Sequence, residues 1–197
     1  MKEKFKKFFA PTKFKRLFDI VVSFFALIIL SPLFLVICIA NLLTPNTSVF
    51  FSHERRGRKG KPFKIYKFQT MKNNTPNVAT GDLENPEQYI TKVGKFLRKT
   101  SLDELPQIFN VLMGHMSLVG PRPYLKNEIK EMGEAKNIIL LAKPGITGYW
   151  QVNGRSDVSF EERVKMDCWY VKNWSLWIDL LIIFKTIKVV INKTGAK

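Results

Sequence analysis

Two adjacent carboxylates, Asp103 and Glu104, are the strongest candidates for chemistry in this chain, and they stand in the run Ser-Leu-Asp-Glu-Leu-Pro. Such a pair can hold Mg²⁺, and one of its members can act as a nucleophile toward phosphorus. Arg98 and Lys99 come just before the pair and can neutralise phosphate charge. The pattern therefore indicates chemistry on a phosphorylated substrate.

The same residues also fit a structural interpretation. Ser101 and Glu104 have the spacing of a capping box, and acids in the first turn of a helix complement its dipole. Proline is best tolerated at the first helical position, so Pro106 allows a helix that begins only at Leu105 or Pro106. That helix would leave both acids in the turn before it.

A second candidate is Arg122 in the run Gly-Pro-Arg-Pro. Each proline fixes its own φ and restricts the residue before it, so the guanidinium is held on a stiff loop where it can bind phosphate. A rigid turn with a solvated arginine fits the run equally well. The same two interpretations apply to Arg155, which follows a glycine, and to Lys67 on an expected strand.

Composition narrows the class of protein. The chain has 197 residues, a net charge of +16 and a pI near 9.9, a balance that favours an anionic partner. Cys38 and Cys168 are too few for a disulfide framework and fit a reducing compartment. Two histidines, His53 and His115, make a zinc site improbable, so a metal would be held by carboxylates, as suits Mg²⁺.

The chain also contains a long apolar segment, which precedes these acids and cations in the sequence. Residues 20–52 contain no charged residue, and the apolar part, residues 20–43, would be about 36 Å long as a helix. This length is enough to cross a bilayer core of about 30 Å. Residues 1–19 and residues 53–67 each carry seven Lys or Arg. The positive-inside rule would keep both flanks on the cytoplasmic side.

Ser31 and Pro32 stand in the middle of this segment. A proline inside a helix removes one backbone hydrogen bond and forces a kink, and the Ser31 hydroxyl can bond a carbonyl that this frees. We therefore predict a re-entrant helix that bends at Ser31-Pro32 and leaves by the face it entered. A single transmembrane span with a tolerated proline remains the main alternative, while a signal peptide and a buried core helix fit less well.

The rest of the chain predicts a mainly helical α+β domain with short strands. We expect two domains, residues 1–48 with a basic N-terminus and the re-entrant helix, and residues 49–197 as a small globular cytoplasmic catalytic domain. Trp and Tyr residues near the last helix favour an interfacial position for it, alongside other amphipathic interfacial helices. The expected elements are strands at 49–51 and 62–71 around a turn at 57–60, a surface loop at 72–90, and helices after Ser101 and at 124–141, 160–172 and 175–192.

Several longer motifs resemble one family, the bacterial sugar transferases that act as monotopic polyprenyl-phosphate phosphoglycosyl transferases. The similarity runs from about Lys15 to Val190 and includes the Ser-Pro bend, and the chain resembles the minimal catalytic form. The departures are Gln69, where the family has Arg or Lys, and His115, where it has Asp. The motifs that carry the resemblance are residues 61–71, 101–107, 116–123, 143–148 and 151–155.

This resemblance implies transfer of a sugar-1-phosphate from a UDP-sugar to undecaprenyl phosphate with release of UMP, the first membrane step of a bacterial glycoconjugate pathway. Asp103 would attack the β-phosphorus and form a phosphosugar–aspartyl intermediate, with Mg²⁺ contacting Asp103 and Glu104 assisting the metal or the nucleophile. The implied substrate-binding residues are Lys67, Arg98, Arg122, Arg155 and Asp167.

The implied location is the cytoplasmic face of the bacterial inner membrane, with an anionic phospholipid bilayer as a partner. The competing hypothesis is a non-enzymatic basic protein that binds a membrane surface or nucleic acid. The basic residues flank the apolar segment instead of forming one stripe, which argues against nucleic acid. Acetamido sugars, galactose and glucose all remain open as the sugar, and the sequence fixes neither the pathway nor an oligomeric state.

Overall fold

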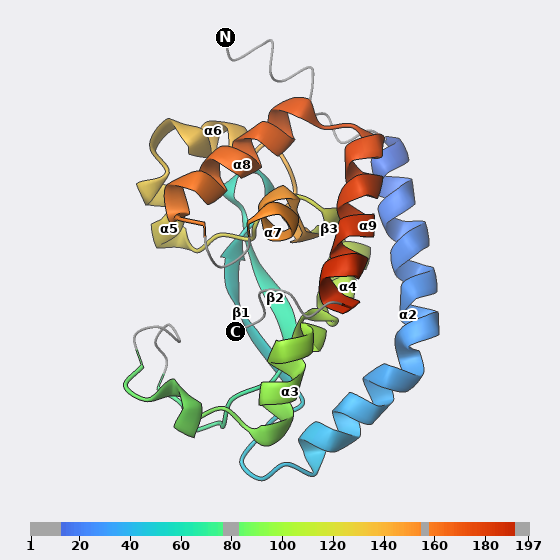
Figure 1. Ribbon diagram of the computed structural model, residues 1–197, viewed down its shortest axis with the longest axis vertical. Helices are drawn as coiled ribbons and strands as arrows, with labels where there is room; N and C mark the ends of the chain where they lie inside the picture. The colour runs from blue at the N-terminus through green and yellow to red at the C-terminus, as the bar shows by residue number, and fades with distance from the viewer. Residues whose placement is uncertain (1–12, 77–82, 155–157, 192–197) are drawn as a thin grey trace.

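The computed structural model describes residues 13–76, 83–154 and 158–191 (Figure 1). Within them the fold is mainly helical α+β, as predicted. The strands are β1 (Phe50–Arg56), β2 (Pro62–Phe68), β3 (Ser117–Val119) and β4 (Gly145–Thr147). The α-helices are α2 (Lys13–Leu42), α3 (Lys92–Thr100), α4 (Gln107–Leu112), α5 (Lys126–Glu131), α6 (Lys136–Ile139), α7 (Tyr149–Asn153), α8 (Phe160–Asn173) and α9 (Leu176–Ile191). The 3₁₀ turns are η1 (Arg58–Gly60), η3 (Pro86–Gln88), η4 (Leu102–Glu104) and η5 (Gly133–Ala135).

Helix α2 contains Pro32 and bends in its C-terminal half (Figure 1). Residue 32 would normally donate its N–H to the carbonyl of Ile28, but proline has no N–H. The Ser31 hydroxyl donates to this same carbonyl at 2.7 Å. The predicted compensation by Ser31 is therefore confirmed, and the helix bends without leaving that acceptor unbonded.

Most of the apolar surface of α2 is exposed. Ile29 is 74% exposed, and its neighbours on the helix show the same pattern. By length and composition α2 is able to cross a membrane, and its low burial differs from that of the core helix of a soluble protein. These features support a membrane location. The other large apolar side chains of residues 20–43 that are at least half exposed are Phe24, Phe25, Ile28, Leu35, Val36, Leu42 and Leu43.

The N-terminal half of α2 lies beside α9 and is joined to it by a buried ion pair (Figure 1). The Lys15 ammonium lies 2.6 Å from the Asp179 carboxylate, and both side chains are almost fully buried. The Tyr170 hydroxyl and the Trp174 indole N–H also donate to Asp179, at 2.7 and 3.1 Å. A buried charge is tolerated when it is paired and hydrogen-bonded in this way.

Two further polar side chains fix α2 to the rest of the chain. Asp19, one turn after Lys15, accepts from the Ser117 hydroxyl and the Leu118 backbone N–H at the start of β3. Arg16 donates to the last carbonyls of α4, at 2.6 and 2.8 Å. Thus the N-terminal part of α2 packs against the remaining chain through polar side chains, whereas Phe34 and Ile37 pack its C-terminal part in an apolar cluster. The division of the chain at residue 48 stays a prediction.

Strands β1 and β2 form the predicted antiparallel hairpin around η1, with Phe51 opposite Lys67 and His53 opposite Ile65. Phe63 and Ile65 are buried on one face of β2, and Phe68 is buried on the opposite face in a separate apolar cluster. The first strand is longer than predicted, because it continues to Arg56. The extension places more polar side chains on the hairpin than the sequence pattern indicated.

A short parallel pair, β3 and β4, was not predicted. It requires close contact between backbones: a Cβ added to Gly120 or to Gly145 would collide with the backbone of the other segment. A Cβ on Gly148 would likewise collide with the Gly120 carbonyl. These three glycines bring two motifs that are distant in sequence into direct contact.

The single helix predicted at 124–141 is wrong. The segment forms α5, η5 and α6 instead, because Gly133 adopts a φ of +55° that an α-helix does not accept. Helices α8 and α9 confirm the last two predicted helices, and α3 and α7 were not foreseen. Part of the predicted loop at 72–90 forms η3, and its residues 77–82 lie outside the described residues.

The buried ion pair gives a stability prediction. Asp179→Ala should lower the free energy of unfolding by about 3–5 kcal/mol, because it leaves the Lys15 ammonium buried without its carboxylate. Glu87→Gln is the matched control: its ion pair with Lys95 is more than 70% exposed, and its loss should cost less than about 1 kcal/mol. Denaturant titration of the full chain in detergent micelles measures both, and equal losses would contradict the assignment.

Candidate functional site

The acid pair lies in the turn η4, between α3 and α4. Ser101 ends α3 in the left-handed conformation, with a φ of 58°, and its side chain makes no capping hydrogen bond. Pro106 is the N-cap residue of α4. The structure therefore has the second of the two arrangements considered from sequence: the helix starts after the proline, and the acids precede it.

A lysine from the hairpin holds both acids. The Lys67 ammonium lies 2.6 Å from the Glu104 carboxylate and 3.6 Å from the Asp103 carboxylate. Arg98, at the end of α3, donates to the Thr70 hydroxyl at 2.9 Å and acts electrostatically on Asp103. Segments from two parts of the chain thus place two cations around the two acids.

The protonation of these groups follows from burial and charge. Burial raises the pKa of Asp103 above its usual range, and Lys67 and Arg98 oppose that rise. Burial alone would lower the pKa of Lys67, but Glu104 and Asp103 outweigh it and raise that pKa. Lys67 therefore stays charged and supports the ionised form of the acid that a nucleophile requires.

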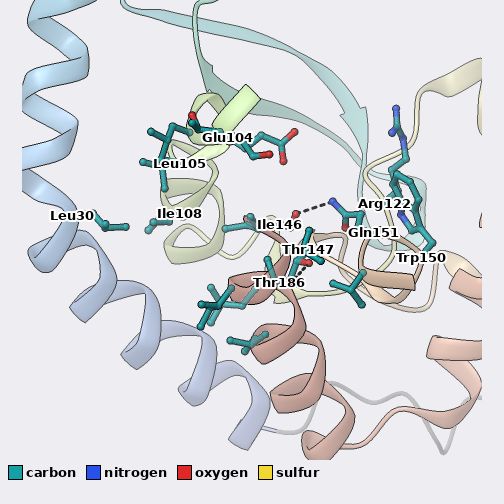
Figure 2. A pocket seen from close by; sticks show the side chains of 18 of the residues that line it. Leu30, Glu104, Leu105, Ile108, Arg122, Ile146, Thr147, Trp150, Gln151 and Thr186 are labelled. Atoms are coloured by element: carbon teal, nitrogen blue, oxygen red, sulfur yellow. Dashed lines mark hydrogen bonds between the residues drawn. The ribbon is translucent and has the colours of Figure 1, made fainter. Parts of the chain in front are cut away.

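A cavity of about 800 Å³ lies next to η4 and has two different walls (Figure 2). Leu30 of α2 and Ile108 of α4 lie on one side, while Arg122 and Gln151 lie on the other, with Glu104 between them in the view. The other apolar lining residues include Val22 of α2, Leu105, and Ile183 and Ile187 of α9, and Arg98 and Arg163 are further cations of the lining.

A smaller cavity of about 170 Å³ adjoins the acids and is much more polar. Lys67 and Glu104 line it, and Arg122 lines both cavities. The sequence prediction missed His53 and Arg55 of β1, which also line the smaller cavity. Extending the strand alternation from residue 51 would have placed both on the same face as Lys67.

Several buried polar atoms around the smaller cavity have no hydrogen-bond partner within the part of the chain that the structure describes. They are His53 Nδ1, Arg55 Nη1, Arg122 Nε, Trp150 Nε1 and Gln151 Oε1. Buried polar groups are rarely left unbonded unless a ligand or water completes them. Together with the nearby cations, these atoms suit a ligand that is anionic and rich in oxygen atoms.

His53 contributes to this cavity as a neutral ring. Arg55 Nε donates to His53 Nε2 at 2.6 Å, so Nε2 is the acceptor and Nδ1 carries the proton. Burial, followed by the charges of Arg55, Lys67 and Arg122, lowers the pKa of His53 to about 4. The ring is therefore a hydrogen-bond donor to the cavity at neutral pH and adds no charge.

Asp167 lies behind the Arg122 loop and lines neither cavity. Its carboxylate accepts from the Arg122 backbone N–H at 3.0 Å and from the Tyr124 hydroxyl at 2.8 Å. The Arg122 guanidinium lies 5.8 Å from the centre of the Trp150 ring. Asp167 thus positions the loop, and Arg122 is the member of this group that faces the cavities.

The structure brings together Lys67, Arg98, Asp103, Glu104 and Arg122 around the two cavities. Glu104 lines both cavities, whereas Asp103 lines neither and lies beside Lys67 at their edge. Arg155 lies outside the described residues.

The two departures from the family pattern line neither cavity. Gln69 donates to the Met71 carbonyl and to Asn73, so it holds the chain after β2. His115 is exposed, and its ring lies 5.9 Å from the centre of the Phe63 ring.

The carboxylates near the cavities limit which metal ion the site could bind. Among the described residues, no group of three or more His, Cys, Asp or Glu side chains could hold an ion. The two carboxylates of η4 are fewer than an all-protein site needs. They fit Mg²⁺, which commonly binds one or two carboxylates and takes its other oxygens from water and substrate phosphates.

Comparison with known proteins identifies similar chains. The family model described as "Bacterial sugar transferase" matches residues 10–193. The chain is 47% identical over 197 residues to the undecaprenyl-phosphate galactose phosphotransferase of Salmonella typhimurium, a match that covers 92% of this chain and 41% of that protein.

Two further relatives differ in how much of their length is matched. The chain is 43% identical to an exopolysaccharide production protein of Sinorhizobium fredii, covering 92% of this chain and 87% of that protein. It is 44% identical to the UDP-glucose:undecaprenyl-phosphate glucose-1-phosphate transferase of Klebsiella pneumoniae, covering 92% of this chain and 41% of that protein. The chain thus spans about two fifths of some relatives and most of another.

The buried Asp167 gives a pH prediction. Burial raises its pKa to about 7, against about 3.9 in the unfolded chain. The native state therefore binds the proton more tightly, and stability from this group falls as pH rises from about 4 to about 7, by up to about 4 kcal/mol. Asp167→Asn should remove that dependence. Denaturant titrations should show that the free energy of unfolding of the variant, relative to that of the unsubstituted chain, is higher at pH 8 than at pH 5. The same difference in free energy at both pH values would contradict the prediction.

Proposed function

Because the chain belongs to the bacterial sugar transferase family, we propose that it transfers a sugar-1-phosphate from a UDP-sugar to undecaprenyl phosphate and releases UMP. The names of the Salmonella and Klebsiella relatives support this acceptor for those proteins, and the Klebsiella name also specifies a UDP-sugar donor. The family match counts against the alternative of a non-enzymatic basic protein.

The observation that carries the proposal is the cavity with two walls (Figure 2). A polyprenyl phosphate has an apolar tail and a charged head, whereas a UDP-sugar is soluble in water. Val22, Leu30 and Ile187 provide apolar surface for the tail, and Arg122 on the facing wall provides a cation for phosphates, while Arg98 also lines the cavity. Both substrates can therefore reach Glu104 and the adjoining acid from opposite sides.

In the first step, an oxygen of the Asp103 carboxylate attacks the β-phosphorus of the donor. The bond from that phosphorus to the bridging oxygen breaks, and UMP leaves with the electron pair. Lys67 stays charged beside both acids, which favours the ionised nucleophile before attack. Arg122 and the His53 N–H are placed to stabilise negative charge in the smaller cavity.

In the second step, a phosphate oxygen of the acceptor attacks the phosphorus of the aspartyl intermediate. The Asp103–phosphorus bond breaks, which restores the carboxylate and gives a lipid diphosphate sugar. Glu104 lines both cavities and holds Lys67 at 2.6 Å, so it orients the cation throughout. Mg²⁺, held by Asp103 and the phosphates, would supply neutralisation of the diphosphate charge.

The membrane arrangement that fits this reaction is the re-entrant one. The bend of α2, its exposed apolar surface and the basic residues on both flanks support a helix that enters one leaflet and returns. We place the catalytic residues on the cytoplasmic face, where UDP-sugars are made. The exposed Trp177 and Phe184 of α9 support an interfacial position for that helix.

The nucleophile has a direct test. Asp103→Asn should lower UMP release by at least about a thousand-fold and abolish a phosphosugar adduct trapped from donor alone, because the amide cannot form the intermediate. Glu104→Gln should lower turnover but still form the adduct. Glu161→Gln, an exposed acid at the start of α8, is the control and should behave like the unsubstituted chain. An adduct in the Asn variant, detected by intact-mass spectrometry, would exclude Asp103 as nucleophile.

The metal has a separate test. Removal of divalent ions with EDTA should stop UMP release, because the diphosphate charge would then lack a counter-ion beside two carboxylates. Adding Mg²⁺ back should restore the rate, and Ca²⁺, which prefers more ligands and longer distances, should restore it less. Turnover that continues unchanged in EDTA would show that Lys67 and the arginines suffice.

A further inference from the structure

Three cations gather at a place that the reaction does not use, around the turn after α4. Gly114 turns the chain with a φ of +85°. A Cβ built on it would lie 3.4 Å from Arg16 Nη2 and 3.5 Å from Lys143 Nζ, so both charged groups border the same space. Arg58, which donates to the Leu141 carbonyl at 2.9 Å, acts electrostatically on Lys143.

Few carboxylates neutralise the charges of these three cations. None of the ion pairs in the described part of the chain involves Arg16, Arg58 or Lys143. Asp19 is the acid that acts on Lys143, but it already accepts hydrogen bonds from β3. Burial, followed by the charge of Arg16, lowers the pKa of Lys143. Like charges held this close favour an anion between them.

The cluster lies at the level where the apolar surface of the protein begins. Phe14 and Leu17, on either side of Arg16 in sequence, are 61% and 58% exposed, and Met113, just before the glycine, is 50% exposed. Trp177, at the start of α9, is 67% exposed and lies on the same end of the α2–α9 pair, because Lys15 binds Asp179. Exposed tryptophan next to apolar surface is typical of the headgroup level of a membrane.

We propose that Arg16, Arg58 and Lys143 form a binding site for the phosphate of an anionic membrane phospholipid, separate from the cavities beside the acid pair. None of the three lines either cavity. The lipid tails would lie along the exposed Phe14, Leu17 and Met113. A free phosphate would gain only the charges, whereas a phospholipid gains both the charges and the apolar contact.

The site would hold one end of α2 at a fixed depth. Arg16 also binds the last carbonyls of α4, so a phosphate at this place is connected through one side chain to the helix that follows the acids. The proposal rests on the membrane location of α2 and does not depend on the transfer reaction.

The test uses the full chain in a zwitterionic detergent and short-chain phosphatidylglycerol, below its critical micelle concentration, as the probe. Each positive charge near an anionic lipid is worth about 1 kcal/mol, so Lys143→Gln should weaken binding about five-fold. Arg58→Gln should have a similar effect. The Lys143 variant is the cleanest of the three, because loss of Arg16 also frees the α4 carbonyls and loss of Arg58 frees the Leu141 carbonyl. Native mass spectrometry of bound lipid, or the shift in unfolding temperature, gives the affinity.

Lys126→Gln is the matched control: this exposed lysine is on α5, which Figure 1 shows on the opposite side of the molecule from α2. It removes the same charge and should leave the affinity unchanged. Equal affinity in the Lys143 and Lys126 variants would overturn the site. Displacement of the lipid by an equimolar amount of inorganic phosphate would overturn the assignment to a headgroup. UMP release, measured in parallel in detergent, should stay unchanged in the Lys143 variant, which separates this site from the transfer site.

Discussion

The rest of the structure depends on the burial of Lys15 against Asp179. An ammonium and a carboxylate that are both nearly excluded from water are stable only together and with their hydrogen bonds made, which the Tyr170 hydroxyl and the Trp174 N–H provide. This requirement fixes α2 beside α9 in one register. The same register sets the apolar wall of the larger cavity, since that wall is built from both helices. The N-terminal part of a helix whose apolar surface is mostly exposed is therefore positioned by its few polar side chains.

A second constraint acts at the acid pair. Burial raises the pKa of Asp103, the less exposed of the two adjacent acids, and the charge of Glu104 raises it further. Lys67 opposes both effects, because it lies against Glu104 at 2.6 Å and near Asp103 at 3.6 Å. The lysine comes from β2 and the acids from η4, so this balance exists only when the hairpin and the end of α3 are packed together. Arg98 and Arg122 add further positive charge near the acids, which suits substrates that carry several phosphates.

The third constraint is the close approach of backbones at Gly120, Gly145 and Gly148. Because no side chain fits between these segments, the Arg122 loop and the helix that carries Gln151 are held on one wall of the cavities. Asp167 supports the same loop from behind through the Arg122 N–H and the Tyr124 hydroxyl. Motifs separated by about thirty residues in sequence thus act as one surface, in the manner expected when a site is built on rigid, closely packed elements.

The sequence by itself determined the local features: the apolar segment with its Ser31-Pro32 bend, the hairpin around η1, helices α8 and α9, and the acids in the turn before Pro106 as one of two options. These follow from charge, periodicity and proline chemistry within short windows. Only the tertiary structure decided that Lys67 bridges the acids, that His53 and Arg55 line the smaller cavity, and that Asp167 lies behind the loop. The physical reason is that contacts between distant segments depend on how helices and strands pack, and Gly133, Gly120 and Gly145 give little local sign of the break or the close approach that they allow.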